Sequence, residues 1–184
     1  MKGFDYAGGG YYFVTICALG RKKMFGEIVG ARRDAPINDN KTMPINRDKT
    51  NMVLNENGKS ISNIWGTLPE HHPVMLDEIC IMPNHIHLIL IIKNKKQGAG
   101  ENAEQGASRR APTGKTLGWI IGMFKTECTK TINRLNGTSG KQIFQRNYYE
   151  RIIRNEEEYF KIKNYIRMNP LMWERDRNNP QNRI

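Results

Sequence analysis

The segment from His85 to Ile92, HIHLILII, constrains the fold more than any other part of the sequence. Apart from the two histidines, every residue in it is aliphatic, and β-branched isoleucine recurs, as strands favour. A short run that is apolar on both faces is typical of a strand buried on both sides. We therefore predict that this segment lies in the middle of a β-sheet.

Further strands are predicted on either side of it in the sequence. Residues Met75 to Met82 alternate as a strand does, and the turn pair Pro83-Asn84 joins them to the histidine strand as a hairpin. Tyr11 to Cys17 follows a glycine triplet and is rich in β-branched and aromatic residues, which predicts a first strand. Ile143 to Gln145 is also strand-like.

The helical signals lie between these strands and after them. Apolar residues recur at helical spacing from Thr116 to about Leu135, which predicts a long amphipathic helix capped by Thr116. Ser60 to Trp65 is expected to open a short helix that ends before Pro69. Asn155, with Glu158 three residues on, resembles a capping box and begins a last helix that Pro170 stops.

The chain of 184 residues is long enough for one domain with a substantial core, so we expect a single domain over residues 1–184. Two stretches, about 31–51 and 94–114, are polar and lack helical or strand periodicity. We expect both to be loop insertions outside the core.

Charge and cysteine usage limit the partners and the setting. Lys and Arg number 29 against 18 Asp and Glu, a net charge of +11 that favours a polyanion such as nucleic acid over an anionic membrane surface. The three cysteines are widely spaced and fit neither a disulfide framework nor a zinc site. We expect a cytoplasmic protein with no membrane association, because the longest strongly apolar stretch, Leu88 to Ile92, is far too short to span a bilayer.

His85 and His87 are the strongest chemical signal in the sequence. Residues two apart in a strand point to the same face, so both imidazoles project together from the sheet. Two neutral imidazoles on one face form half of a metal site. Taken alone, an HxH pair also fits a core histidine with satisfied hydrogen bonds beside an incidental one.

A second pair, Tyr165 and Asn169, lies at the end of the last predicted helix. Four residues apart, the two side chains share one face a turn apart. A tyrosine hydroxyl is a poor nucleophile near its ordinary pKa of about 10 and needs a cation to favour the phenolate. Asn169 can supply a carbonyl oxygen as a third metal ligand, or it can simply end the helix before Pro170.

Together these motifs resemble a known family. The segment MPNHIHLIL at Met82 to Leu90 and YIRMNP at Tyr165 to Pro170 resemble the REP-associated tyrosine transposases, relatives of the single-tyrosine insertion-sequence transposases. YFVTIC from Tyr12, MFG from Met24, LNENGK from Leu54 and FQRNYYERIIRNEEEY from Phe144 agree. The resemblance covers nearly the whole chain except the two predicted loops.

The resemblance implies an α+β fold of the HUH endonuclease class, with a ferredoxin-like antiparallel sheet and helices on one face. His85, His87 and Asn169 would be metal ligands for Mg²⁺ or Mn²⁺, although insertion-sequence relatives often have Gln at the position of Asn169. Tyr165 would be the nucleophile that attacks a DNA phosphate, leaving a 5′-phosphotyrosine and a free 3′-OH.

Aromatic and basic residues near the last strand are candidates for DNA contacts. Tyrosines can stack on bases and arginines can contact phosphates, and the set comprises Arg146, Tyr148, Tyr149, Arg151 and Arg154. A packed or solvated role is an equally simple explanation for them. Tyr159 is a rival nucleophile, but it lies on the apolar stripe of the helix and has no ligand-type residue four positions later.

Three functions fit these residues. The first is a DNA transposase that cuts and rejoins single-stranded or hairpin DNA as a monomer or homodimer. The second is a domesticated hairpin-DNA-binding protein that no longer cuts. The third is another HUH enzyme, a replication initiator or a relaxase. The full set His85, His87, Tyr165 and Asn169 speaks against the second, and the small size speaks against the third.

Overall fold

The computed structural model describes residues 9–30, 51–93 and 116–182. Its main sheet has four strands, β1 (Gly9–Cys17), β4 (Val74–Ile81), β5 (His85–Lys93) and β6 (Tyr149–Ile153). The order across the sheet is β4-β5-β1-β6, and each neighbouring pair is antiparallel. The histidine strand β5 is therefore an inner strand, as its sequence predicts.

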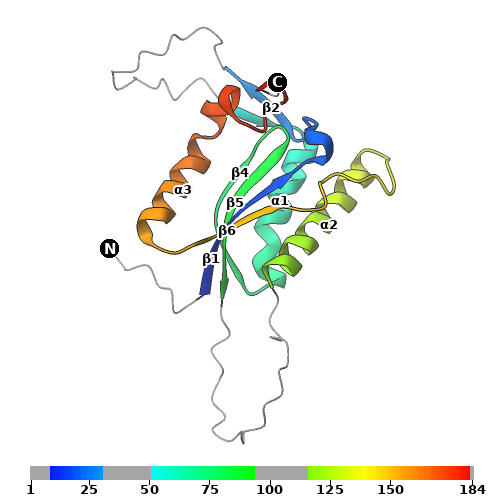
Figure 1. The fold of residues 1–184 in the computed structure, drawn as a ribbon. Helices are drawn as coiled ribbons and strands as arrows, with labels where there is room; N and C mark the ends of the chain where they lie inside the picture. The colour runs from blue at the N-terminus through cyan, green and yellow to red at the C-terminus, as the bar shows by residue number, and fades with distance from the viewer. Residues whose placement is uncertain (1–8, 31–50, 94–115, 183–184) are drawn as a thin grey trace, which may run out of the picture.

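Helices alternate with these strands in the order of a ferredoxin-like fold. Helix α1 (Glu56–His71) connects β1 to β4, and α2 (Leu117–Leu135) connects β5 to β6. Helix α3 (Glu156–Met168) follows β6, and a small hairpin of β2 (Gly26–Val29) and β3 (Asn51–Leu54) is inserted before α1. The predicted α+β fold with an antiparallel sheet is confirmed (Figure 1).

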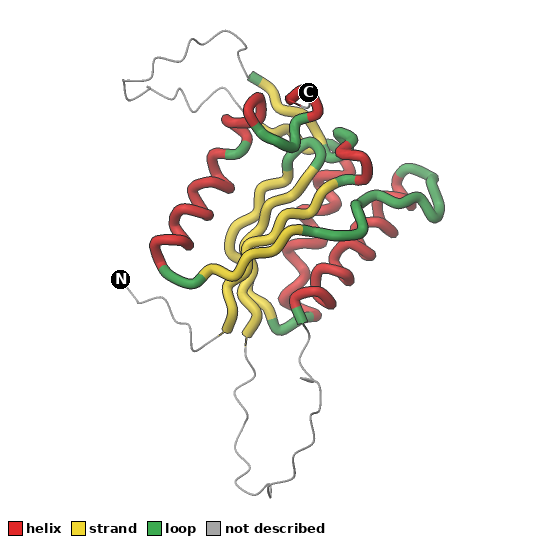
Figure 2. The backbone as a smooth tube through the Cα atoms, viewed as in Figure 1, coloured by secondary structure: helices red, strands yellow, loops and turns green. Residues whose placement is uncertain are grey.

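The predicted placement of the helices on one face is wrong, because they cover both faces of the sheet (Figure 2). Helices α1 and α2 pack on the face that carries Ile86, Leu88 and Leu90, whereas α3 packs on the opposite face through Ile166. Ile166 forms a small cluster there with the strand residues Phe13, Ile89 and Ile153. A second layer is required because β5 is apolar on both faces and would otherwise expose Ile89.

Several predicted boundaries hold. Thr116 caps α2 by accepting a hydrogen bond from the Trp119 N–H, and Asn155 caps α3 by accepting one from the Glu158 N–H. Pro170 ends α3 and begins the short 3₁₀ helix η3 (Pro170–Arg175), which is followed by η4 (Pro180–Asn182). These ends are readable because capping is a local interaction.

Two predictions along the chain need correction. Helix α1 spans Glu56–His71 and contains Pro69 in its last turn, whereas the sequence predicted an end before that proline. The predicted strand at Ile143 to Gln145 is only an isolated bridge between Phe144 and Ala18, and the fourth strand lies later, at Tyr149–Ile153. Four of the five residues in that strand are exposed, so it lacks the alternating apolar signal of a half-buried strand.

The predicted loop insertions, residues 31–51 and 94–114, lie outside the described residues, except that Asn51 begins β3. Among the helices that the structure describes, none has the length and apolar character needed to cross a membrane.

Candidate metal and tyrosine site

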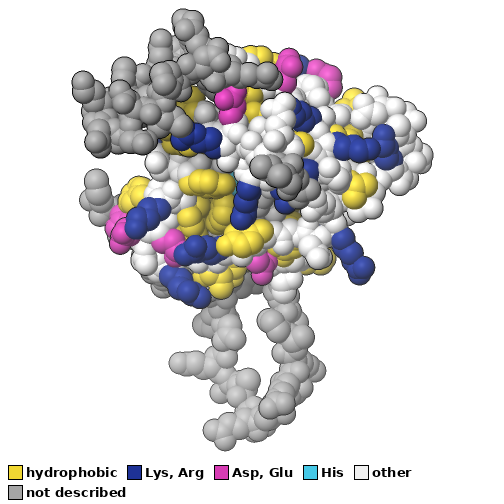
Figure 3. Space-filling model, turned by 45° about the horizontal axis from the view of Figure 1, so that its top comes forward, with side chains coloured by type: hydrophobic (Ala, Val, Ile, Leu, Met, Phe, Trp, Pro, Cys, Tyr) yellow, Lys and Arg dark blue, Asp and Glu magenta, His cyan; other side chains and the backbone are white. Residues whose placement is uncertain are grey.

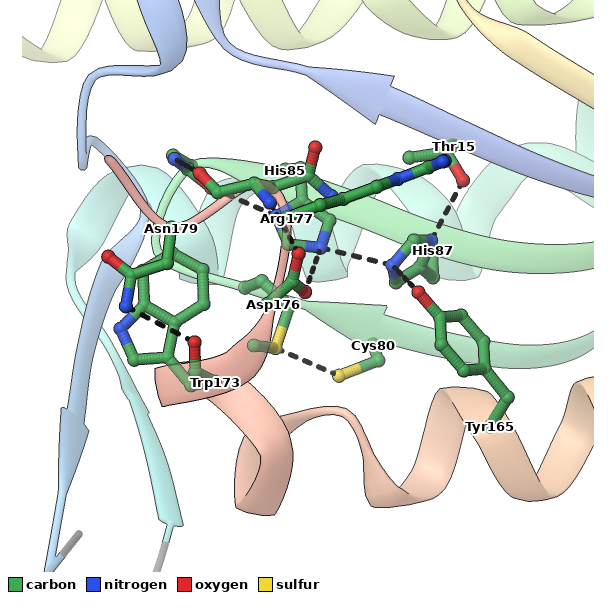
Figure 4. A network of polar contacts seen from close by, with 12 residues as sticks. Thr15, Cys80, His85, His87, Tyr165, Trp173, Asp176, Arg177 and Asn179 are labelled. Carbon is green, nitrogen blue, oxygen red and sulfur yellow. Dashed lines mark hydrogen bonds and ion pairs between the residues drawn. The ribbon is translucent and has the colours of Figure 1, made fainter. Parts of the chain in front are cut away.

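Strand β5 places His85 and His87 on the sheet face that α3 covers. Both side chains are almost completely buried, at 0% and 1% exposure. Their Nε2 atoms lie 3.0 Å apart, so the two rings converge on one point, as the alternating strand geometry predicts (Figure 4). Two nitrogens at this separation can both reach one divalent cation at about 2.1 Å.

The other ring nitrogen of each histidine is held by a neighbour. Asn84 in the β4–β5 turn donates both of its amide hydrogens, to the carbonyls of Arg21 and Asn178, so its Oδ1 accepts from Nδ1–H of His85 at 2.9 Å. Thr15 on β1 holds Nδ1 of His87 at 2.8 Å. Such partners fix the tautomer and orientation of metal-binding histidines. They leave the two Nε2 atoms to face each other.

The environment keeps both histidines neutral. Burial lowers the pKa of His85 far below its usual value, and the positive charge that His87 and Arg21 would place beside it lowers it further. Burial also lowers the pKa of His87 to about 3, with Arg177 adding to the effect. Neutral imidazoles carry the lone pair that a metal ion needs.

Two buried oxygens beside these nitrogens have no hydrogen-bond partner. They are Oδ1 of Asn169, the residue that follows α3, and Oδ2 of Asp176, which lies after η3. Asp176 Oδ2 is 3.5 Å from His85 Nε2, and burial raises the pKa of its carboxyl group. Two imidazoles and two oxygens of this kind form a suitable donor set for a divalent cation.

Asn169 and Asp176 differ in how far the sequence anticipated them. Asn169 is 3% exposed, and its amide acts to raise the pKa of His85 and to lower the pKa of Tyr165, so it lies near both residues. It thus lies where its spacing from Tyr165 predicts. Sequence reasoning missed Asp176, because the segment that carries it has no periodicity and reaches the histidines only through the tertiary fold. Within the described residues, His85, His87 and Asp176 form a cluster whose ligand atoms lie within 4.8 Å of one another.

Helix α3 presents Tyr165 to this site. Its hydroxyl lies 3.4 Å from His87 Nε2, and its ring packs edge-on against His87 and Phe13. The side chain is 46% exposed, so its hydroxyl lies between the buried histidines and solvent. Burial raises the pKa of Tyr165, and the nearby charge of Asp176 adds to this, so the neutral phenol is favoured in the protein alone.

The rival tyrosine, Tyr159, points elsewhere. Its hydroxyl is bound by Lys163 at 2.8 Å, and Lys163 also pairs with Asp77 on β4. Its ring packs edge-on against Tyr11 at the start of the sheet. Tyr165 lies six positions further along the helix, which corresponds to about 9 Å along the axis.

An open groove with a volume of 510 Å³ adjoins the histidines through Thr15. Tyr148 and Tyr149, two of the predicted DNA contacts, line it. Its cations are Arg21 and Arg177, which sequence reasoning missed. The guanidinium of Arg21 donates to the Arg177 carbonyl at 3.0 Å, and Arg21 adopts a φ of 52°, which is uncommon for a residue with a side chain.

The other predicted DNA contacts lie outside this groove. Arg146 lines a separate depression beside α2, where its carbonyl accepts from Lys125. Arg151 on β6 pairs with Glu158 at 2.6 Å, and the backbone N–H of Arg154 donates to the same glutamate. These contacts connect β6 to the start of α3. On the face that Figure 3 displays, Lys and Arg side chains border an apolar area.

Comparisons with known proteins identify relatives of this chain. No family model matches it. An "Uncharacterized protein" of Haemophilus influenzae is 32% identical over 180 residues, which cover 96% of this chain and 88% of that protein. A second Haemophilus influenzae protein, named "Putative REP-associated tyrosine transposase", is 25% identical over 129 residues, or 68% of this chain and 65% of that protein.

Two solved structures were also found. One is a REP-associated tyrosine transposase bound to a REP hairpin, with 16% identity and a TM-score of 0.47 over 94% of this chain and 74% of that one. The other is the crystal structure of a "putative transposase" from Deinococcus radiodurans, with 12% identity and a TM-score of 0.48 over 91% of this chain and 95% of that one.

Proposed function

We propose that this chain is a REP-associated tyrosine transposase, as its 25% identity to a relative of that name supports, and that it cuts and rejoins single-stranded DNA through a covalent phosphotyrosine. The observation that carries the proposal is the position of the Tyr165 hydroxyl beside the two histidines. Its Oη lies 3.4 Å from Nε2 of His87, and that Nε2 lies 3.0 Å from Nε2 of His85. A nucleophile placed beside a cation-binding pair is the arrangement that this chemistry needs.

His85, His87 and Asn169 hold Mg²⁺ or Mn²⁺ in this proposal. Their donor atoms fit a hard or intermediate divalent cation. Such a cation would also be a partner for Oδ1 of Asn169, which has no hydrogen bond in the protein alone. A cation bound here supplies positive charge that polarises the scissile phosphate and favours the phenolate form of Tyr165. Thr15 and Asn84 keep both rings oriented for it.

Tyr165 performs the covalent step. Its Oη forms a bond to the phosphorus of a backbone phosphate, and the bond from that phosphorus to the 3′ oxygen breaks. The phenol proton leaves to water, and the released 3′ oxygen takes up a proton, so the products are a 5′-phosphotyrosine and a free 3′-OH. Attack by a 3′-OH on this linkage reverses the step and rejoins the strand.

The groove beside Thr15 receives the single strand. Tyr148 and Tyr149 offer faces for base stacking, and Arg21 and Arg177 offer charge for two phosphates. The net charge of +11 supports a polyanionic substrate of this kind. We propose hairpin DNA with a single-stranded flank, because the rings of Tyr148 and Tyr149 can stack on the bases of an unpaired strand.

End-labelled hairpin oligonucleotides test this chemistry. With Mn²⁺ present, a 3′ label is expected to migrate with the protein on a denaturing gel, while a 5′-labelled fragment is released with an end that a polymerase extends. A 5′ label attached to the protein would contradict the proposed polarity. Hairpin binding with no attachment of either label would favour the domesticated DNA-binding protein.

A further inference from the structure

We propose that Asp176 is a ligand of the same cation, so that the chain segment after α3 completes the metal site. The inference rests on the proposed function for the existence of the metal, and it adds a ligand that neither the spacing of the motifs nor the position of Tyr165 predicts. The site would then have two nitrogen and two oxygen donors, one of them negatively charged.

The first support is the state of the carboxylate itself. Asp176 is 8% exposed, and its Oδ2 has no hydrogen-bond partner but faces His85 Nε2 at 3.5 Å. A buried carboxylate is costly unless a cation or hydrogen bonds compensate it. Because Nδ1–H of His85 is directed at Asn84, the Nε2 atom that faces the carboxylate offers a lone pair rather than a proton. A cation between the two atoms would satisfy both.

The second support is another buried oxygen without a hydrogen-bond partner near the same histidines. Oδ1 of Asn169 is buried and has no hydrogen-bond partner, and only 3% of the residue is exposed. It comes from the end of α3, whereas Asp176 comes from the turn after η3. The two ends of η3 thus bring unsatisfied oxygens to one pair of histidines. Buried polar groups in folded proteins nearly always have partners, so a common missing partner explains both.

The third support is that hydrogen bonds and ring packing hold the segment from Trp173 to Asn178 in place beside the histidines. Oδ1 of Asp176 accepts from the Asn178 N–H at 2.6 Å, and the Asn178 carbonyl accepts from Asn84, the residue that orients His85. Trp173 stacks on His85 with ring centroids 6.1 Å apart and planes at 25°. Figure 4 shows Trp173 and Asp176 beside the histidines. Such contacts preorganise a ligand.

This donor set makes a prediction about metal choice. Imidazole nitrogens favour first-row transition ions over Mg²⁺, whereas carboxylate and amide oxygens accept Mg²⁺ and Mn²⁺ alike. A site with two of each should therefore bind Mn²⁺ more tightly than Mg²⁺. Removing the negative charge of Asp176 should weaken both ions.

Calorimetric titration of the full chain with MnCl₂ tests the inference without any DNA. Asp176→Asn keeps the volume and the acceptor for the Asn178 N–H, and we expect it to weaken Mn²⁺ binding by about tenfold or more. The matched control is Asp77→Asn, which removes a partly buried carboxylate whose Oδ2 also lacks a hydrogen-bond partner, but which pairs with Lys163 away from the histidines. It should bind Mn²⁺ like the wild type.

A second variant covers the case in which Asp176→Asn unfolds. Asp176→Ser retains a hydroxyl for the turn, and it should lose the Mn²⁺-induced rise in Tm that the wild type shows. Wild-type Mn²⁺ affinity in a folded Asp176 variant would overturn the inference and leave the tyrosine chemistry standing. Weakened Mn²⁺ binding in that variant, combined with a wild type that forms no DNA adduct, would support the ligand and overturn the proposed function.

Discussion

The hydroxyl of Tyr165 lies 3.4 Å from Nε2 of His87, although 78 residues separate the two in the sequence. The contact exists because α3 covers the face of the sheet that carries the histidines, so the last helix and an inner strand meet. The geometry of this contact therefore depends on the groups that hold each side chain in place: Thr15 for His87, and the packing of Ile166 for the helix that carries Tyr165.

Thr15→Val should weaken metal binding without unfolding the protein. Valine has nearly the shape of threonine but cannot hold Nδ1 of His87, which the Thr15 hydroxyl contacts at 2.8 Å. Loss of such a supporting group typically costs about 10–100-fold in metal affinity. Calorimetry with MnCl₂ measures the effect. Thr126→Val is the control, because the exposed Thr126 hydroxyl donates only to the Gly122 carbonyl of the same helix. An equal loss of Mn²⁺ affinity in both variants would exclude a specific role for Thr15.

Ile166→Ala should reduce DNA attachment beyond what its effect on stability explains. Ile166 is the buried residue of α3 and packs on Phe13 and Ile89, so truncation should cost about 2–5 kcal/mol of folding free energy and loosen the helix that carries Tyr165. Ile132→Ala on α2 removes an equally buried side chain on the opposite face. Both are compared by urea unfolding and by adduct yield well below their Tm. Equal yields would mean that the packing of α3 does not position the tyrosine.

Sequence patterns were enough for the parts of the fold that local rules govern. The buried strand at His85 and the caps at Thr116 and Asn155 follow from periodicity and from side-chain hydrogen bonds within a few residues. The edge strand β6 was not predicted, because most of its residues are exposed and its sequence therefore lacks the apolar alternation of a half-buried strand. The prediction of one helical face failed for a related reason, since nothing local says which face a terminal helix will cover.

The same distinction applies to the site. The spacing of His85 with His87 and of Tyr165 with Asn169 is readable because each pair lies on one regular element. Asp176 and Arg177 follow η3, and Arg21 ends a short 3₁₀ helix, Leu19–Arg21, after β1. All three approach the histidines only when the chain is folded. No spacing rule connects them with β5, so only a three-dimensional structure could reveal them.

Arg177→Gln should weaken hairpin binding in a salt-dependent way. Arg177 lines the groove beside the histidines, and each phosphate that a cation neutralises releases counterions. The slope of log affinity against log salt should become less negative by about 1 when one such contact is lost. Fluorescence anisotropy over a salt series measures it. Arg134→Gln, at the exposed end of α2, should leave the slope unchanged, and a wild-type slope in Arg177→Gln would remove this residue from the DNA path.

The most direct test of the central claim is covalent attachment of hairpin DNA to Tyr165→Phe. The substitution removes one oxygen from a side chain that is 46% exposed, so fold and DNA affinity should be retained while the adduct on a denaturing gel disappears. Tyr159→Phe, whose hydroxyl bonds to Lys163, should form the adduct like the wild type. An adduct that persists in Tyr165→Phe and is lost in Tyr159→Phe would contradict the assignment of the nucleophile.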